Sequence, residues 1–162
     1  MVEHYRLNAG IVVFNKARKV LLCRRNDVKD SWQFPQGGID EGEAAKEAAF
    51  RELKEETSLT RVTWVTTLKE PARYRFPPEI ISSMQKRGFN NVGQDMYWSL
   101  FYFNGDDNEI NLNTAQPEFD EFRWGTLEEA YLLVVDFKKP AYQKAVSAFK
   151  PLIEQYKIAD NR

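Results

Sequence analysis

The 162-residue chain contains only one cysteine, Cys23, and only one histidine, His4. A single cysteine excludes an internal disulfide and is typical of a reducing compartment, so we expect a cytoplasmic protein. No apolar run approaches the length of a membrane-spanning helix, and no hydrophobic signal segment follows Met1, which argues against a membrane protein. The formal net charge of −1 excludes a global field that would recruit nucleic acid. Any bound polyanion must therefore meet locally placed positive charge.

Apolar and aromatic residues are abundant, at 43% and 14% of the chain, which is enough for a packed core. The length fits one domain covering residues 1–162. Hydrophobic patterns and turn residues predict strands at 4–15, 19–25, 61–69, 97–103, 110–112 and 119–124, and helices at 43–57, 127–135 and from Pro140 onward. This mixture predicts an α/β fold with helices packed against a mixed sheet. The sequence leaves the oligomeric state open.

Residues 70–95 contain three prolines and two glycines, and no clear hydrophobic period. We interpret this segment as one long loop. Loops of that length inside a compact domain are often functional lids or binding loops, so the segment is a candidate part of the binding site.

The predicted helix at 43–57 is unusually acidic. Glu52, Glu55 and Glu56 fall within an arc of roughly 100°, beside the apolar positions Ala49 and Leu53. Like charges at the edge of a buried face repel one another, so a cation is expected among them. Clustered carboxylate oxygens suit Mg²⁺ or Mn²⁺. The alternative is a solvated helix whose glutamates pair with lysines four residues away.

The string GGIDEGEAAKEAAFRELKEETSL, residues 37–59, resembles the signature of the Nudix hydrolase family. Gly37 is followed by five residues and Glu43, and then by seven residues and RELKEETSL. One position departs from the family pattern: Ser58 stands where the family has a glycine, which readily adopts a left-handed conformation after a helix. The resemblance implies an α/β/α sandwich with a loop–helix–loop catalytic motif. It also implies metal-dependent hydrolysis of a nucleoside diphosphate linked to another moiety.

The same resemblance implies roles for individual residues. Glu43 and Arg51 correspond to a pair that braces the loop against the helix, and Glu118, in PEFDEF, corresponds to an additional carboxylate that binds metal or acts as general base. The implied catalytic or metal-binding positions are Gly37, Arg51, Glu52, Glu55, Glu56 and Glu118, with Mg²⁺ or Mn²⁺ as the cofactor.

Stretches outside this string resemble one subgroup of the family. YRLNAGIVVFN, SWQFPQGGID, PEFDEFRW and VVDFKKPAY are similar to diadenosine tetraphosphate hydrolases and to the related bacterial RNA pyrophosphohydrolases. The implied substrate-binding positions are Arg6, Arg25, Gly37, Gly38, Tyr74, Val135, Phe137 and Lys138. Four of the implied site residues have structural alternatives. Arg6 and Arg25 can be surface charges, Phe137 can be core packing, and Glu118 can be a strand cap.

The expected function is cleavage of dinucleoside polyphosphates, 5′-triphosphate RNA ends, or both, by metal-assisted attack of water on phosphorus. Two alternatives stay open: an enzyme acting on RNA 5′ ends alone, and a catalytically silent module that binds nucleotide or RNA. A departure from the subgroup bears on affinity. Tyr97 stands where relatives usually carry a lysine aimed at the polyphosphate. This predicts weaker polyphosphate binding or a shifted substrate choice, unless Arg73, Arg75, Lys86 or Arg87 compensates.

Overall fold

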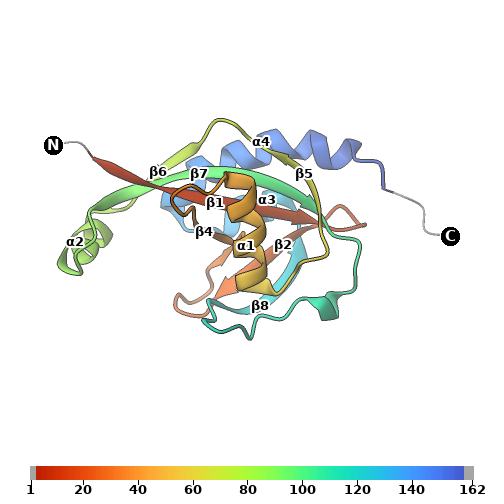
Figure 1. Cartoon of the computed structure of the whole chain (residues 1–162), viewed down its shortest axis with the longest axis horizontal. Coiled ribbons are helices and arrows are strands. Elements are labelled where there is room, and N and C mark those ends of the chain that lie inside the picture. The colour runs from red at the N-terminus through yellow and green to blue at the C-terminus, as the bar shows by residue number, and fades with distance from the viewer. Residues whose placement is uncertain (1–2, 159–162) are drawn as a thin grey trace.

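The structure is a computed structural model that describes residues 3–158 (Figure 1). Within those residues, eight strands form one mixed sheet. Their bounds are β1 His4–Phe14, β2 Val20–Arg25, β3 Trp32–Gln33, β4 Gln36–Gly38, β5 Thr63–Thr67, β6 Ala72–Arg75, β7 Asn91–Tyr102 and β8 Phe119–Gly125. The helices are α1 Ala45–Thr57, α2 Pro78–Lys86, α3 Leu127–Leu133 and α4 Lys139–Gln155, with short 3₁₀ turns η1 Asp107–Glu109 and η2 Asp136–Lys138.

The long strands β1 and β7 run parallel to each other along nearly their whole length at the centre of the sheet. The other pairings are antiparallel, and the main path through the sheet is β3-β2-β1-β7-β5. β4 pairs with β1, β6 with β7, and β8 with β2. The C-terminal halves of both strands, residues 9–14 and 98–102, are largely apolar and buried, because both faces of the sheet are covered there.

Helices cover both faces of the sheet, which confirms the expected α/β/α sandwich. α1 lies in front of the sheet in Figure 1, and α3 and α4 lie behind it. Alternate residues of β1 enter different cores: Ile11 and Val13 pack with Leu53 of α1, whereas Val12 packs with Phe149 of α4. This alternation follows from the two-residue period of a strand.

The helix signals near the C-terminus are confirmed. Thr126 and Glu129 form the expected capping box of α3, with each side chain accepting a hydrogen bond from the backbone of the other. Pro140 lies in the first turn of α4, where its missing N–H has no intrahelical partner to lose. Among residues 3–158, no helix combines the length and the apolar character needed to cross a membrane.

The interpretation of residues 70–95 as one long loop is wrong. The segment contains β6, α2 and the start of β7. Pro78 begins α2 as its first helical residue, where proline is favoured. β6 pairs with β7 from Ala72 to Arg75. The prolines and glycines therefore mark element ends rather than a structureless loop.

Two smaller expectations also need correction. The segment 31–42, predicted as loop, contains the two short strands β3 and β4. Residues 110–112, predicted as a strand, are irregular chain, because the Asn111 backbone bonds to the end of α1 at Thr57 and Ser58 instead of to a strand.

A buried aromatic group holds the β3–β4 turn against α4. Phe34 stacks on Tyr142 with ring centroids 5.0 Å apart, and it lies edge-on to Trp98 at 5.7 Å. The Phe34 N–H donates to the Tyr142 hydroxyl at 2.9 Å, and the Trp98 indole donates to the Ala141 carbonyl at 3.1 Å. These contacts fix the position of β4, which enters the candidate site.

Candidate active site

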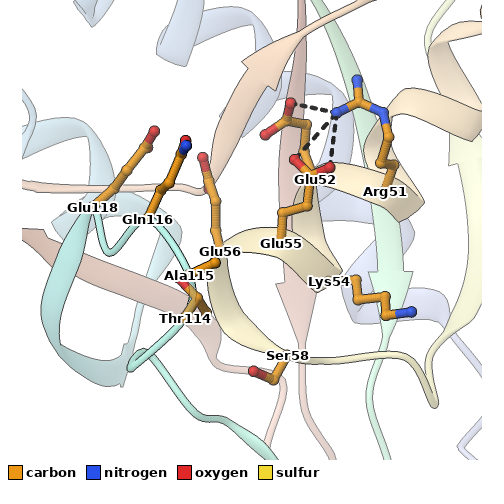
Figure 2. Close-up of a pocket in the computed structure, with 10 residues that line it drawn as sticks. All are labelled: Arg51, Glu52, Lys54, Glu55, Glu56, Ser58, Thr114, Ala115, Gln116 and Glu118. Carbon is orange, nitrogen blue, oxygen red and sulfur yellow. Dashed lines mark hydrogen bonds and ion pairs between the residues drawn. The ribbon is translucent and has the colours of Figure 1, made fainter.

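The acidic residues of α1 face the chain segment that leads to β8 (Figure 2). Glu56 is only 6% exposed, and none of the described residues donates a hydrogen bond to its carboxylate oxygens. Burial raises the pKa of Glu56 well above its usual value, and the nearby charge of Glu118 raises it further. Because an unpaired buried carboxylate is strongly unfavourable, the position of Glu56 favours a bound cation.

Arg51 connects the start of the motif to the helix. Its guanidinium donates to both Glu43 oxygens, at 2.8 and 2.9 Å, and to the Gly38 carbonyl at 2.8 Å. The other terminal nitrogen donates to Glu52 at 2.8 Å and Glu55 at 3.2 Å. The hydrogen bonds from Arg51 to Glu43, aided by one from the Asp40 backbone, lower the pKa of Glu43 to about 2. The structure thus brings together Arg51 and Glu43, the two residues that the resemblance paired, and links the loop to the helix through them.

The glycine pair of β4 allows side chains to approach its backbone closely. A Cβ atom at Gly37 would lie 1.9 Å from the Glu52 carboxyl carbon. A Cβ atom at Gly38 would lie 2.1 Å from the Arg6 guanidinium. Any larger residue would displace these groups, so the glycines allow a carboxylate and a guanidinium to lie directly against the strand.

Glu118 immediately precedes β8 and lies across from α1 (Figure 2). Asn26 holds this point of the chain, because its side chain donates to the Pro117 carbonyl at 2.8 Å and its N–H donates to the Glu118 carbonyl at 3.0 Å. Glu118 and Glu52 both line the two cavities that meet at the carboxylates.

The donor set fits a hard divalent cation, because it consists of carboxylate oxygens and includes the unpartnered Glu56. In the arrangement of the described residues, however, no three acidic, histidine or cysteine side chains form a group that could hold a metal ion. Arg51 accounts for part of this result, since it draws Glu52 and Glu55 into ion pairs (Figure 2). Binding of a cation would thus require these carboxylates to reorient.

A polar cavity of about 460 Å³ adjoins the carboxylates and is lined in part by Arg6, Arg25 and Lys138. Arg25 is paired with Asp27, with contacts of 2.8 and 2.6 Å. Lys138 is 4% exposed, and its ammonium donates to Gln33 at 3.2 Å. Burial, aided by the charge of Arg25, lowers the pKa of Lys138 to about 8.

An apolar cavity of about 400 Å³ opens on the other side of Lys138. Its aromatic wall consists of Tyr74, Phe76 and Phe137, with ring centroids 5.7 to 6.0 Å apart. Val135 also lines it. The structure thus gathers the predicted residues Tyr74, Val135, Phe137 and Lys138 around one space. Phe137 is partly buried and packs against the core that includes α4, and it also lines this cavity.

Gln36 is a site residue that the sequence analysis missed. It lines both the polar and the apolar cavity. Its oxygen accepts from Lys138 at 3.3 Å, and its nitrogen donates to Gln94 at 3.0 Å and to the Tyr74 hydroxyl at 3.4 Å. The available signal was the position of Gln36 directly before the glycine pair. The glycine backbone lies against Glu52 and Arg6, so the residue before it lies near the same site. Phe76 and Ile80 were missed because 70–95 was interpreted as loop.

The two departures from the family pattern have different outcomes. Ser58 adopts the left-handed conformation expected there, with φ at 71°, and its hydroxyl donates to the Asn111 carbonyl at 2.8 Å. Tyr97 lines none of the cavities at the site. Arg73 and Arg75 pair with Asp95 and Glu3 respectively and line none of these cavities, so they do not take the place of a phosphate-binding lysine here. 

The sequence profile of the NUDIX domain matches residues 4–147. The chain is 40% identical to Nudix hydrolase 26 of Arabidopsis thaliana, a chloroplastic protein, over 91% of this chain and 70% of that protein. It is 39% identical to an RNA pyrophosphohydrolase of Shewanella denitrificans, over 98% of this chain and 92% of that protein.

Solved structures support the same fold. The dihydroneopterin triphosphate pyrophosphohydrolase of E. coli aligns with 90% of this chain and 99% of its own, with a TM-score of 0.69 at 19% identity. An Ap4A hydrolase of C. elegans aligns with 89% of this chain and 98% of its own, with a TM-score of 0.61 at 22% identity. At these identities the likeness concerns the fold alone.

The fold and the carboxylate-lined cavities are those of a hydrolase that acts on pyrophosphate bonds. The chain belongs to the Nudix hydrolase family, and both relatives named above, from Arabidopsis thaliana and Shewanella denitrificans, resemble it along more than nine tenths of its length.

Proposed function

We propose that this Nudix hydrolase acts on nucleosides that carry a 5′ polyphosphate, either dinucleoside polyphosphates such as diadenosine tetraphosphate or the 5′-triphosphate ends of RNA. One observation carries the proposal: a polar cavity with three basic and three acidic residues in its lining lies between the apolar cavity and the cavity that contains the unpaired carboxylate Glu56. An aromatic wall suits a base, and the cations suit phosphates. The apolar cavity followed by the polar cavity therefore matches a nucleoside followed by a chain of phosphates.

The proposed cofactor is Mg²⁺ or Mn²⁺. Glu52, Glu55, Glu56 and Glu118, with the carbonyl of Gly37, would hold it. When bound, the metal offsets the charge of the phosphates and activates water for attack on phosphorus. The buried carboxylate of Glu56, with no protein donor, is the ligand whose environment most favours this role.

The side chains around the phosphates have separate tasks in this proposal. Arg51 holds the loop and helix in register, so the carboxylates keep a fixed relation to Gly37 and Gly38. Arg6 and Arg25 contact phosphate oxygens, and either Glu118 or a helix glutamate accepts the proton of the attacking water. Water attacks one phosphorus, and the bridging P–O bond to the other half of the substrate breaks.

At the nucleoside end, Phe137 offers its partly exposed ring to a base, the buried Tyr74 packs against Phe137, and Val135 closes the apolar wall. Lys138 reaches both cavities, so its ammonium lies where a base meets the first phosphate. Gln33 and Gln36 orient this ammonium through their side-chain oxygens. Recognition by stacking and one cation would tolerate several bases.

The second candidate, RNA 5′ ends as the main substrate, is favoured by the similarity to the Shewanella denitrificans RNA pyrophosphohydrolase across 98% of this chain. A silent binding module is disfavoured because all the motif carboxylates are present. We further propose that residues 1–162 form a single Nudix domain that works in the cytoplasm. The single buried cysteine fits that compartment.

The test is a paired assay with Mg²⁺, using diadenosine tetraphosphate and a short 5′-triphosphate RNA. Wild type and Glu56→Gln are measured with both substrates. We expect cleavage of at least one substrate by the wild type and near-complete loss in the variant. The preferred substrate distinguishes the two candidate functions. A wild type that binds both substrates but cleaves neither would instead support the silent module.

A further inference from the structure

The largest cavity beside the site is a groove of about 710 Å³ between α1 and residues 114–118, and none of the roles assigned above uses it fully. It is called the α1 groove here. Ser58, Thr114, Ala115 and Gln116 line it, together with the carboxylates (Figure 2). Its volume lies within the range of about 300–1,000 Å³ that is common for small-molecule sites.

The α1 groove continues the row of cavities already described. The apolar and polar cavities share Arg25, Gln36, Gln94 and Lys138. The polar cavity and the α1 groove share Glu52 and Glu118. The apolar cavity and the α1 groove share no lining residue. The apolar cavity therefore comes first, followed by the polar cavity, the carboxylates and the α1 groove.

Metal ions alone would not fill the α1 groove. Its lining follows α1 from Arg51 to Ser58, a length of about 10 Å at the rise of an α-helix. Ser58 and Ala115 lie at the far end, beyond the carboxylate groups (Figure 2). A second part of the substrate can occupy that end.

The polarity of the α1 groove favours a neutral group over further phosphates. Of its two basic residues, Arg51 is already engaged by Glu43 and Glu52, and Lys54 is exposed, with its side chain pointing away from Glu56 and Glu118 (Figure 2). Away from the carboxylates, the lining offers uncharged hydrogen-bonding groups. The Thr114 hydroxyl oxygen is buried, and no described residue is its hydrogen-bond partner. A sugar or base could complete its hydrogen bonding.

We propose that the α1 groove binds the second nucleoside of a dinucleoside polyphosphate. The attacked phosphorus would then lie between this groove and the apolar cavity, which binds the first nucleoside. This inference rests on the proposed function and specifies which substrate uses the whole row. A triphosphate RNA end would place only its departing phosphates there, whereas a dinucleotide fills the groove with an uncharged ribose and base.

The experiment compares diadenosine tetraphosphate with adenosine 5′-tetraphosphate, which lacks only the second nucleoside. Ala115 is exposed and lines the groove, so Ala115→Trp fills the groove without disturbing the core. Ala17→Trp is the matched control, because Ala17 is also exposed and lies in the β1–β2 turn outside the three cavities. Steady-state kcat/KM is measured for each enzyme with both nucleotides.

We expect Ala115→Trp to lower kcat/KM for the dinucleotide at least tenfold while changing it less than twofold for the tetraphosphate. Ala17→Trp should change neither. Thr114→Val should raise KM for the dinucleotide several-fold and leave the tetraphosphate unaffected. An equal fall for both nucleotides with Ala115→Trp would overturn the proposal, because the segment would then act only by positioning the carboxylates. Unchanged kinetics with both would overturn it as well.

The proposed function can fail separately from this inference. If the wild type hydrolyses neither nucleotide, calorimetric affinities for the same two compounds replace kcat/KM. Selective weakening of dinucleotide binding by Ala115→Trp would still support the α1 groove as a nucleoside site. Equal affinities of wild type and variant for the dinucleotide would refute it.

Discussion

The carboxylate end of the site comes from one continuous stretch of chain, residues 37–58, with Glu118 added from outside. The aromatic end gathers side chains from β4, β6, α2, β7 and η2. The first end is held by ion pairs centred on Arg51. The second is held by ring packing and by hydrogen bonds through Gln36.

The difference in construction implies a difference in what each end contributes. A dense ion-pair network around buried carboxylates fixes charge, and charge placed at a reacting phosphorus acts on kcat. Packed rings with adaptable amide contacts bind a base equally in the ground and transition states, and this acts on KM. Mutations at the two ends should therefore separate in kinetics.

The largest effect is expected at the carboxylate end. Glu56→Gln keeps the shape of the side chain but removes the buried charge, so we expect kcat to fall about 10³-fold. Glu55 has a side chain that is 56% exposed and already pairs with Arg51. Glu55→Gln should therefore cost less, about 10-fold. Turnover at saturating Mg²⁺ measures both, and an equal loss would show that burial does not rank these ligands.

Lys138 tests whether the aromatic end is also under electrostatic strain. Its pKa is lowered from 10.5 to about 8, so between those pH values the unfolded chain binds more protons than the folded one. Stability should thus rise with pH across this window and become flat below it, with a total change of up to about 3 kcal/mol. Lys138→Met should remove the rise.

Urea unfolding of wild type and Lys138→Met is followed from pH 7 to 10.5 in the presence of a chelator. Groups that titrate in both proteins cancel in the difference, including Arg25 and the acidic residues nearby. A difference that stays constant across the window would contradict a neutralised Lys138. The buried ammonium would then be stabilised by Gln33 and Gln36 more than burial disfavours it.

Phe137 separates KM from kcat at the aromatic end. Stacking of a base on an aromatic side chain contributes about 1–3 kcal/mol, so Phe137→Ala should raise KM about 10-fold and change kcat little. Phe89→Ala is the control, because Phe89 is 49% exposed and lies outside the apolar cavity. A fall in kcat equal to the rise in KM would mean that the aromatic end also positions the phosphates.

The same contrast explains what the sequence revealed. Helix α1 and its carboxylates were predictable because helical spacing alone places Glu52 and Glu56 near one face. The pairing of Arg51 with Glu43 was implied by the family pattern. Both are local relations, separated by less than ten residues.

The aromatic end was only partly predictable. Tyr74 was assigned to a loop, yet it is buried on β6, because the pairing of β6 with β7 depends on residues some twenty positions away in the chain. The role of Gln36 depends on Gln94 and Lys138 approaching it from two other elements. The hydrophobic periodicity of a segment and its residue types carry no information on contacts between residues that are distant in the sequence.

The smallest expected effect concerns the end of α1, where the chain departs from its family. Ser58 holds a left-handed conformation that disfavours any side chain by about 1 kcal/mol, and its hydroxyl bond to Asn111 returns a similar amount. Ser58→Ala keeps the strain and loses the bond, so its unfolding free energy should fall by about 1 kcal/mol. Ser58→Gly loses both and should match the wild type. Urea midpoints of the three proteins measure this. If glycine destabilises as much as alanine, the bond to Asn111 outweighs the backbone strain, and serine is the better residue for joining the carboxylate helix to the segment that carries Glu118.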